Sequence, residues 1–143
     1  MFVEQRTKIF PGRYEYLSDI AEFVQLASHD AGFDSSMTYA VETAVDEACS
    51  NVIEHAYGGE GIGDITLICE IEQNLLTIKI IDQGQPFNPD SVPGPYLDKN
   101  CEDHPGHGLG LYFIKSLMDD VKFEFTPGVG TTLTMVKRRE QDV

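Results

Sequence analysis

Positive charge is scarce in this chain. Its 143 residues include 10 lysines and arginines against 24 aspartates and glutamates, so the formal net charge is −14. A surface this acidic repels phosphate backbones and anionic lipid headgroups. We therefore expect no nucleic acid and no membrane surface among its partners, whereas a basic patch on another protein would suit it.

Cysteine is also sparse, and long apolar runs are missing. The three cysteines, Cys49, Cys69 and Cys101, are odd in number and lack CxxC spacing, which predicts neither a disulfide framework nor a zinc site. Cys49 and Cys69 fall in helix and strand patterns typical of small buried thiols. No segment approaches membrane-spanning length, and no secretory leader pattern opens the chain. We expect a cytoplasmic protein.

What the chain does contain is enough for one domain over residues 1–143, since its 41% hydrophobic content is that of a globular protein. Hydrophobic periodicity predicts helices and strands in the order β-α-α-β-β-loop-α-β-β. This order indicates an α+β fold: a two-layer α/β sandwich with a mixed, mostly antiparallel sheet and three helices on one face. The expected strands are residues 6–10, 64–71, 75–81, 121–125 and 131–137, and the expected helices are residues 15–31, 35–56 and 108–118.

The second helix and the segment before the third helix carry further local signals. Ser35 or Ser36 is the expected N-cap of the second helix. Residues 83–107 show no periodicity and are rich in proline and glycine. Because a loop this long is uncommon inside a compact domain, it predicts a lid or a binding role.

The second helix carries three polar residues on one otherwise apolar face, Glu47, Asn51 and His55, each four residues after the last. A buried carboxylate and carboxamide are costly unless they are partnered. They are either a satisfied polar stripe or a site, in which Glu47 abstracts a proton and the Asn51 oxygen binds a hard cation such as Mg²⁺. His55 near the helix end suits a structural role equally well.

Asp82 ends an apolar strand, and Gly84 follows two residues later. Aspartate and glycine are common in a turn that merely ends a strand. The functional alternative is a carboxylate that accepts a hydrogen bond from the adenine amine, with Gly84 letting the purine approach the backbone. Of Thr131 and Thr132 at the start of the last strand, Thr131 is the better candidate to form a hydrogen bond near Asp82 and the adenine. Threonine is, however, common in strands for its propensity alone.

Three alternate glycines, Gly106, Gly108 and Gly110, open the third helix. They follow a proline-rich loop instead of a strand, and no Gly-Lys-Ser/Thr is present, so neither a dinucleotide fingerprint nor a Walker A loop is indicated. Free backbone N–H groups at a helix start can nonetheless bind phosphate. The alternative is loop flexibility with a close helix–sheet contact.

Together these elements resemble the GHKL ATPase superfamily, which includes gyrase, the heat-shock chaperone, histidine kinases and mismatch-repair ATPases. Glu47 to Asn51 is similar to its N box, Asp82-x-Gly84 to its first glycine box, Gly106 to Gly110 to its second, and Gly130-Thr131 to its closing motif. The segments AVDEACSNVIEHAY, IIDQGQPFNP, GLGLYFIKSLMDDV and GTTLTMVK most resemble the small serine-protein kinases that act as anti-sigma factors.

The resemblance implies a Bergerat-type ATP-binding fold with an ATP lid at about residues 83–107. It implies ATP and Mg²⁺ as cofactors, with Glu47 as base, Asn51 as magnesium ligand, Asp82 as adenine reader and the three glycines around phosphate. It further implies an ATP-dependent serine/threonine kinase that phosphorylates a STAS-type anti-anti-sigma protein, sequesters a sigma factor and forms a homodimer. The alternative is an ATP-binding partner-switching regulator without kinase activity.

One part of such a kinase is hard to find in the sequence. Phosphoryl transfer needs a cation on the phosphates, and Lys99 is the one lysine or arginine between Gln83 and Gly110. Arg13 or a residue of a dimer mate is the expected substitute. His29-Asp30 superficially resembles a phosphoacceptor site, but no helical hairpin surrounds it, so a histidine kinase fragment fits poorly.

Overall fold

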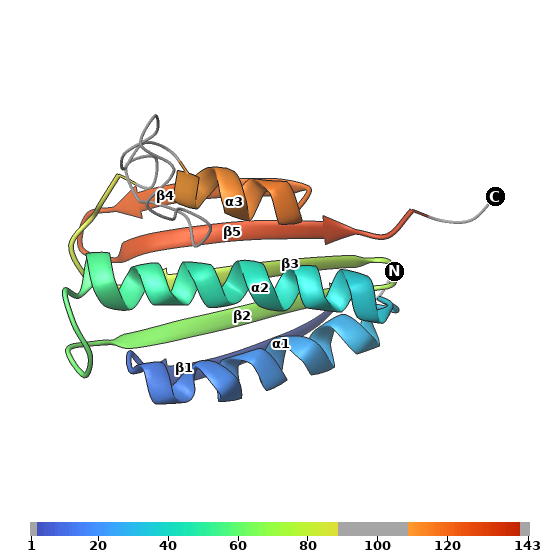
Figure 1. The fold of residues 1–143 in the computed structure, drawn as a ribbon, viewed down its shortest axis with the longest axis horizontal. Coiled ribbons are helices and arrows are strands. Elements are labelled where there is room, and N and C mark those ends of the chain that lie inside the picture. Colours follow the sequence, from blue (N-terminus) through green and yellow to red (C-terminus); the bar gives the residue numbers. More distant parts are fainter. Residues whose placement is uncertain (1–2, 89–108, 141–143) are drawn as a thin grey trace, which may run out of the picture.

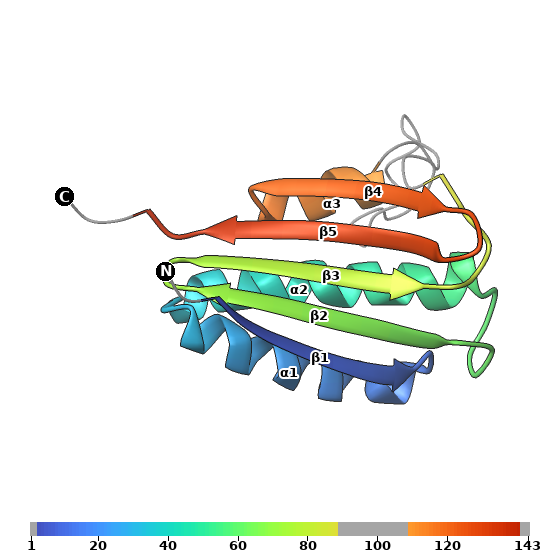
Figure 2. The same ribbon diagram turned by 180° about the vertical axis from the view of Figure 1, so that it is seen from behind.

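The computed structural model describes residues 3–88 and 109–140, and in it the protein is a two-layer sandwich (Figure 1). Five strands form one sheet in the order β1-β2-β3-β5-β4, and the three α-helices cover one of its faces (Figures 1 and 2). The predicted α+β class is confirmed, and every strand pair in the described residues is antiparallel, without the parallel pair that a mixed sheet would contain. In chain order the elements are β1 (Glu4–Pro11), the 3-10 helix η1 (Tyr14–Tyr16), α1 (Leu17–Asp30), α2 (Ser35–Asn51), the π-helix η2 (Val52–Ala56), β2 (Asp64–Glu72), β3 (Leu75–Asp82), α3 (Leu109–Leu117), β4 (Asp120–Thr126) and β5 (Gly130–Arg138).

The core lies between the sheet and the helices. Strands β2, β3 and β5 bury every second residue, because successive side chains of a strand point to opposite faces. Each large aliphatic side chain buried in this way contributes about 1.5–3 kcal/mol. The core residues of β2, β3 and β5 are Ile65, Leu67, Cys69, Ile71, Leu76, Ile78, Ile80, Leu133 and Met135, and β1 contributes Phe10.

Helix α2 is the central helix of the covering layer and packs against both α1 and α3. Its N-cap is Asp34, whose backbone is extended and whose Oδ1 accepts a 2.8 Å hydrogen bond from the Met37 N–H. The expected caps Ser35 and Ser36 are therefore wrong by one or two positions. Ser35 already has helical geometry, so it lies inside the helix and not at its boundary.

The far end of α2 changes its geometry at Asn51. The five residues that follow form the π-helix η2, and the Tyr57 N–H donates to the Val52 carbonyl at 2.9 Å, a five-residue step. A π-turn takes more residues per turn than an α-helix, so the four-residue spacing no longer keeps side chains in one line. Accordingly Asn51 is buried, whereas His55 is 37% exposed and has its ring 5.8 Å from that of Phe87.

The two described cysteines lie in the core. Cys49 and Cys69 are buried free thiols, as the sequence predicts, and Cys101 lies outside the described residues. Among residues 3–88 and 109–140, the helices are all too short or too polar to cross a membrane.

Candidate nucleotide site

Three elements end or begin at the same end of the molecule. The last turn of α2 with η2, the last residue of β3 and the first residue of β5 lie there together (Figure 2). Strands β3 and β5 are neighbours in the sheet, and α2 packs over the sheet on its covered face. Polar residues at these three chain positions are therefore gathered on one end of the sandwich, although the sequence separates them widely.

Asp82 and Thr131 occupy core positions of the sheet. Asp82 continues the buried alternation of Ile78 and Ile80, and Thr131 continues that of Leu133. The two residues are register partners at the end of the β3–β5 ladder, and they are 3% and 8% exposed. Since their side chains stand on the face that the helices cover, the sheet presents a carboxyl and a hydroxyl to the interior, where polar groups are rare.

Burial controls the chemistry of Asp82. Removal from water raises the pKa of its carboxyl above the ordinary value, and a hydrogen bond from the Gly84 N–H opposes that rise. This hydrogen bond runs to Oδ1 at 3.0 Å and makes a tight turn of residues 82–84. A carboxylate has about four acceptor positions, so one such bond leaves Asp82 able to accept another from a ligand.

Gly84 is required by a neighbour inside the protein. A Cβ at this position would lie 2.5 Å from the carbonyl oxygen of Ala56, the last residue of η2, and the Gln85 N–H donates to the same oxygen at 2.8 Å. The chain after β3 therefore runs directly against the end of the π-helix. This contact is a structural reason for glycine that the sequence did not indicate, beside the predicted approach of a purine.

Glu47 and Asn51 remain on one face of α2, as the sequence predicts. Asn51 is buried and Glu47 is half-buried. Burial raises the pKa of Glu47 to about 7; a hydrogen bond from the Asn51 amide lowers it, and the negative charges of Glu54 and Asp46 raise it further. A carboxylate with a pKa close to neutral is suited to accept a proton at physiological pH.

The glycine triplet is only partly described. Gly106 and Gly108 lie outside the described residues, as does most of the expected lid. Gly110 is buried in the first turn of α3, and α3 begins toward the end of the molecule where β3 ends (Figure 1). Its position is compatible with backbone N–H groups directed at phosphate.

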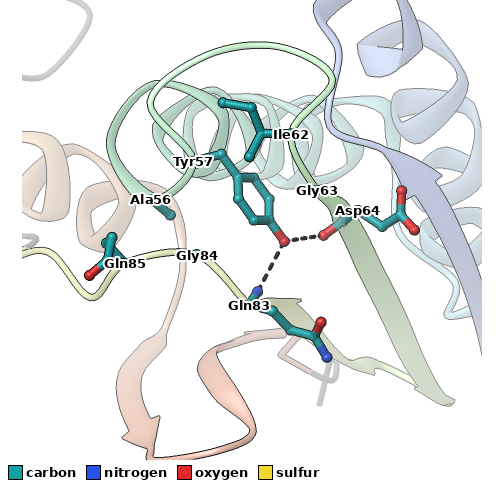
Figure 3. Close-up of a pocket in the computed structure, with 8 residues that line it drawn as sticks. All are labelled: Ala56, Tyr57, Ile62, Gly63, Asp64, Gln83, Gly84 and Gln85. Carbon is teal, nitrogen blue, oxygen red and sulfur yellow. Dashed lines mark hydrogen bonds between the residues drawn. The ribbon is translucent and has the colours of Figure 1, made fainter.

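Sequence reasoning missed Tyr57. Its hydroxyl donates to the carbonyl oxygen of Asp64 at 2.5 Å and accepts a hydrogen bond from the Gln83 N–H at 3.0 Å (Figure 3). These partners lie 7 and 26 positions further along the chain, so local sequence patterns do not predict the two hydrogen bonds. Burial raises the pKa of the Tyr57 hydroxyl, which keeps the proton that it donates.

Tyr57 also lines an open cleft of about 450 Å³ beside the turn that follows β3 (Figure 3). Gln83 and Gly84 line this cleft, whereas Asp82 and Thr131 do not.

Of the cations expected at the phosphates, Arg13 belongs to the described residues and Lys99 does not. Arg13 makes a 2.9 Å ion pair with Glu15, and its guanidinium stands against Gly61. Within the described residues no three histidine, cysteine, aspartate or glutamate side chains are grouped as a metal site. A divalent ion here would have Asn51, phosphate oxygens and water as ligands, which is the arrangement that Mg²⁺ commonly accepts beside nucleotides.

The sequence matches the histidine kinase-like ATPase domain family over residues 10–137. The chain therefore belongs to this family, and the predicted resemblance is confirmed. Among curated proteins it is 33% identical to the serine-protein kinase RsbW of Bacillus mycoides and 34% identical to RsbW of Bacillus cereus. Each match spans 135 residues, 92% of this chain and 84% of the relative.

A solved structure supports the fold independently. The RsbU and RsbW domains of Rv1364c from Mycobacterium tuberculosis align with a TM-score of 0.66, at 17% identity over 94% of this chain. The chain spans 32% of the length of that larger protein. At this identity the likeness concerns the fold, whereas the family assignment rests on the sequence matches.

Proposed function

We propose that this protein is an ATP-dependent serine/threonine-protein kinase that acts as an anti-sigma factor. The observation that carries the proposal is the Glu47–Asn51 pair, in which a half-buried carboxyl with a pKa of about 7 stands one helical turn from a buried carboxamide. Membership of the histidine kinase-like ATPase family and the similarity to RsbW serine-protein kinases support ATP as the phosphoryl donor and a protein hydroxyl as the acceptor.

In this proposal the nucleotide base is recognised at the end of the sheet. Asp82 accepts a hydrogen bond from the adenine amine, and Thr131 beside it supplies a hydroxyl. Guanine lacks an amine at that position, so a buried carboxylate there selects ATP over GTP. Gly110, together with Gly106 and Gly108, offers backbone N–H groups to the phosphates at the start of α3.

The catalytic step needs a base and charge neutralisation. The oxygen of a serine or threonine hydroxyl bonds to the γ-phosphorus, the bond to the β,γ-bridging oxygen breaks, ADP leaves, and Glu47 takes the hydroxyl proton. Asn51 is the residue that would hold Mg²⁺, which supplies positive charge to the phosphates when bound. Lys99, Arg13 or a basic side chain of a second subunit would complete that neutralisation.

The proposed substrate is a STAS-type anti-anti-sigma protein, and the proposed sequestered partner is a sigma factor. A homodimer belongs to the same proposal. The ion pair of Arg13 with Glu15 favours a second candidate, a partner-switching regulator that binds ATP without transferring phosphate, because it engages one of the cations expected to neutralise the phosphates.

Phosphoryl transfer distinguishes these candidates. The protein is incubated with γ-labelled ATP, Mg²⁺ and each STAS-type protein of the same genome. A kinase labels one of them on serine or threonine, and Glu47→Gln loses the label while still binding ATP. Glu72→Gln, at the opposite end of β2, is the matched control and should label normally. Tight ATP binding with no transfer to any candidate would establish the switch instead.

A further inference from the structure

Tyr57 connects two strands where their pairing stops. Strands β2 and β3 pair up to Thr66 with Ile81, and continuing this register by two residues sets Asp64 opposite Gln83. These residues are joined through the Tyr57 hydroxyl, which donates to the Asp64 carbonyl and accepts from the Gln83 N–H. The hydroxyl thus stands in the place of a direct backbone hydrogen bond and holds the two strands apart at this end (Figure 3).

The space for the Tyr57 ring is built by glycines. A Cβ at Gly63 would overlap the ring, and a Cβ at Gly12 would lie 2.5 Å from the Gly63 carbonyl oxygen. The π-helix η2 ends at Ala56, and Tyr57 follows it directly, which places the Tyr57 ring beside Gly63. Gly63 thus leaves room for the ring itself, Gly12 allows the chain after β1 to approach Gly63, and the Tyr57 hydroxyl reaches the turn that follows Asp82.

That turn is fixed from several sides. The Gln85 N–H is held by the Ala56 carbonyl, the Gly84 N–H by Asp82 itself, and the Gln83 N–H by Tyr57. On the far side Gly130 packs so closely that a Cβ there would overlap the Asp82 carbonyl oxygen. Of these contacts, the bond from Gln83 to Tyr57 is made by a side chain outside the turn, so a single substitution can remove it.

We propose that Tyr57 is a positioning residue for base recognition: its hydroxyl holds the backbone after Asp82 so that the buried carboxylate is aimed at the adenine amine. This inference rests on the proposed function, because it requires Asp82 to read adenine. Tyr57 would not touch the base itself. Its contribution is specificity for adenine over guanine, since guanine gains nothing from a well-aimed acceptor at that position.

Replacement Tyr57→Phe removes the oxygen and keeps the ring against Gly63. Calorimetric titration should show ATP affinity reduced about fivefold to tenfold with GTP affinity unchanged, so that the ATP/GTP preference falls by the same factor. Tyr14→Phe is the matched control, because it deletes a tyrosine hydroxyl bonded to Glu54 on the surface of η2, and it should keep the wild-type preference.

Each other outcome overturns the inference. An unchanged ATP/GTP preference, or an equal loss for both nucleotides, would leave Tyr57 without a role in specificity. A Tyr57→Phe protein that no longer unfolds cooperatively would assign the hydroxyl to the fold. Asp82→Asn measured in parallel separates the two proposals: if it abolishes the preference while Tyr57→Phe preserves it, only the positioning role fails, and if it too preserves the preference, the adenine assignment itself fails.

Discussion

Asp82 and Thr131 face each other across the last register pair of β3 and β5, and both are buried. A carboxyl and a hydroxyl at core positions of two neighbouring strands lower the stability of a simple sandwich unless they serve a ligand or a network. The strand end that carries Asp82 lies beside the end of α2 (Figure 1), and this placement supports the proposed role of the pair in binding a base.

Asp82→Asn should therefore weaken ATP binding without unfolding the protein. The substitution preserves shape and can still accept the Gly84 N–H, but it removes a charged acceptor. Hydrogen bonds to charged groups contribute about 1.5–3 kcal/mol, which corresponds to roughly a tenfold to hundredfold loss of ATP affinity. Titration calorimetry measures that loss, and circular dichroism melting checks the fold. ATP affinity equal to that of the wild type would exclude Asp82 as the adenine reader.

Thr131→Val tests the hydroxyl partner of this carboxyl. Valine has nearly the same shape, so the change isolates one hydrogen bond of about 0.5–1.5 kcal/mol, and ATP affinity should fall roughly twofold to tenfold. Thr132→Val is the matched control, because the neighbouring side chain points to the uncovered face of the sheet. Equal effects of the two substitutions on ATP affinity would contradict a specific role of the Thr131 hydroxyl.

Much of this site could be predicted because it follows the two simplest periodicities. The i, i+4 spacing of Glu47 and Asn51 holds within α2, and strand alternation continues to Asp82 and Thr131. The layer order followed from the same patterns. These features depend on neighbours within one element, which a single sequence displays directly.

What could not be predicted depends on distant contacts. Tyr57 acts on Asp64 and Gln83, and Gly84 makes room for the carbonyl of Ala56. The π-turn leaves the apolar pattern of the helix intact while changing the direction of the residues beyond Asn51. Asp34 as N-cap was missed for a local reason: it precedes two serines that cap helices equally well, and only the backbone angles show where the helix begins.

Of the two glycines where β4 turns into β5, Gly128 and Gly130, we expect Gly130 to tolerate substitution least. Its φ is +121°, and a Cβ would overlap the Asp82 carbonyl, so Gly130→Ala forces β3 and β5 apart. We expect a loss of about 3 kcal/mol or more in the free energy of unfolding. Gly128→Ala is the control for a positive φ in the same turn: its φ is +81° and nothing lies within 4 Å of the added carbon, so the cost should be about 1 kcal/mol. Comparable urea-denaturation midpoints for the two variants would contradict the steric argument.

The raised pKa of Glu47 makes the stability of the protein depend on pH in a definite direction. The folded state holds this proton up to a pH of about 7, whereas the unfolded carboxyl loses it near 4.5. The stabilisation that the protonated carboxyl provides is thus complete below pH 4.5 and is lost as the pH rises through 7. Glu47→Gln keeps the side chain neutral at every pH, so its melting temperature relative to the wild type should rise between pH 5 and pH 8.

Melting curves of both proteins across that range, with Glu72→Gln as the control for removing one negative charge, check this expectation. The same ionisation should appear in catalysis, where the rate of phosphoryl transfer rises with pH through about 7 as Glu47 becomes able to accept a proton. A stability difference between Glu47→Gln and the wild type that stays constant from pH 5 to pH 8 would mean that the carboxyl is already ionised at pH 5. Glu47 would then be a weaker base than the proposed mechanism requires.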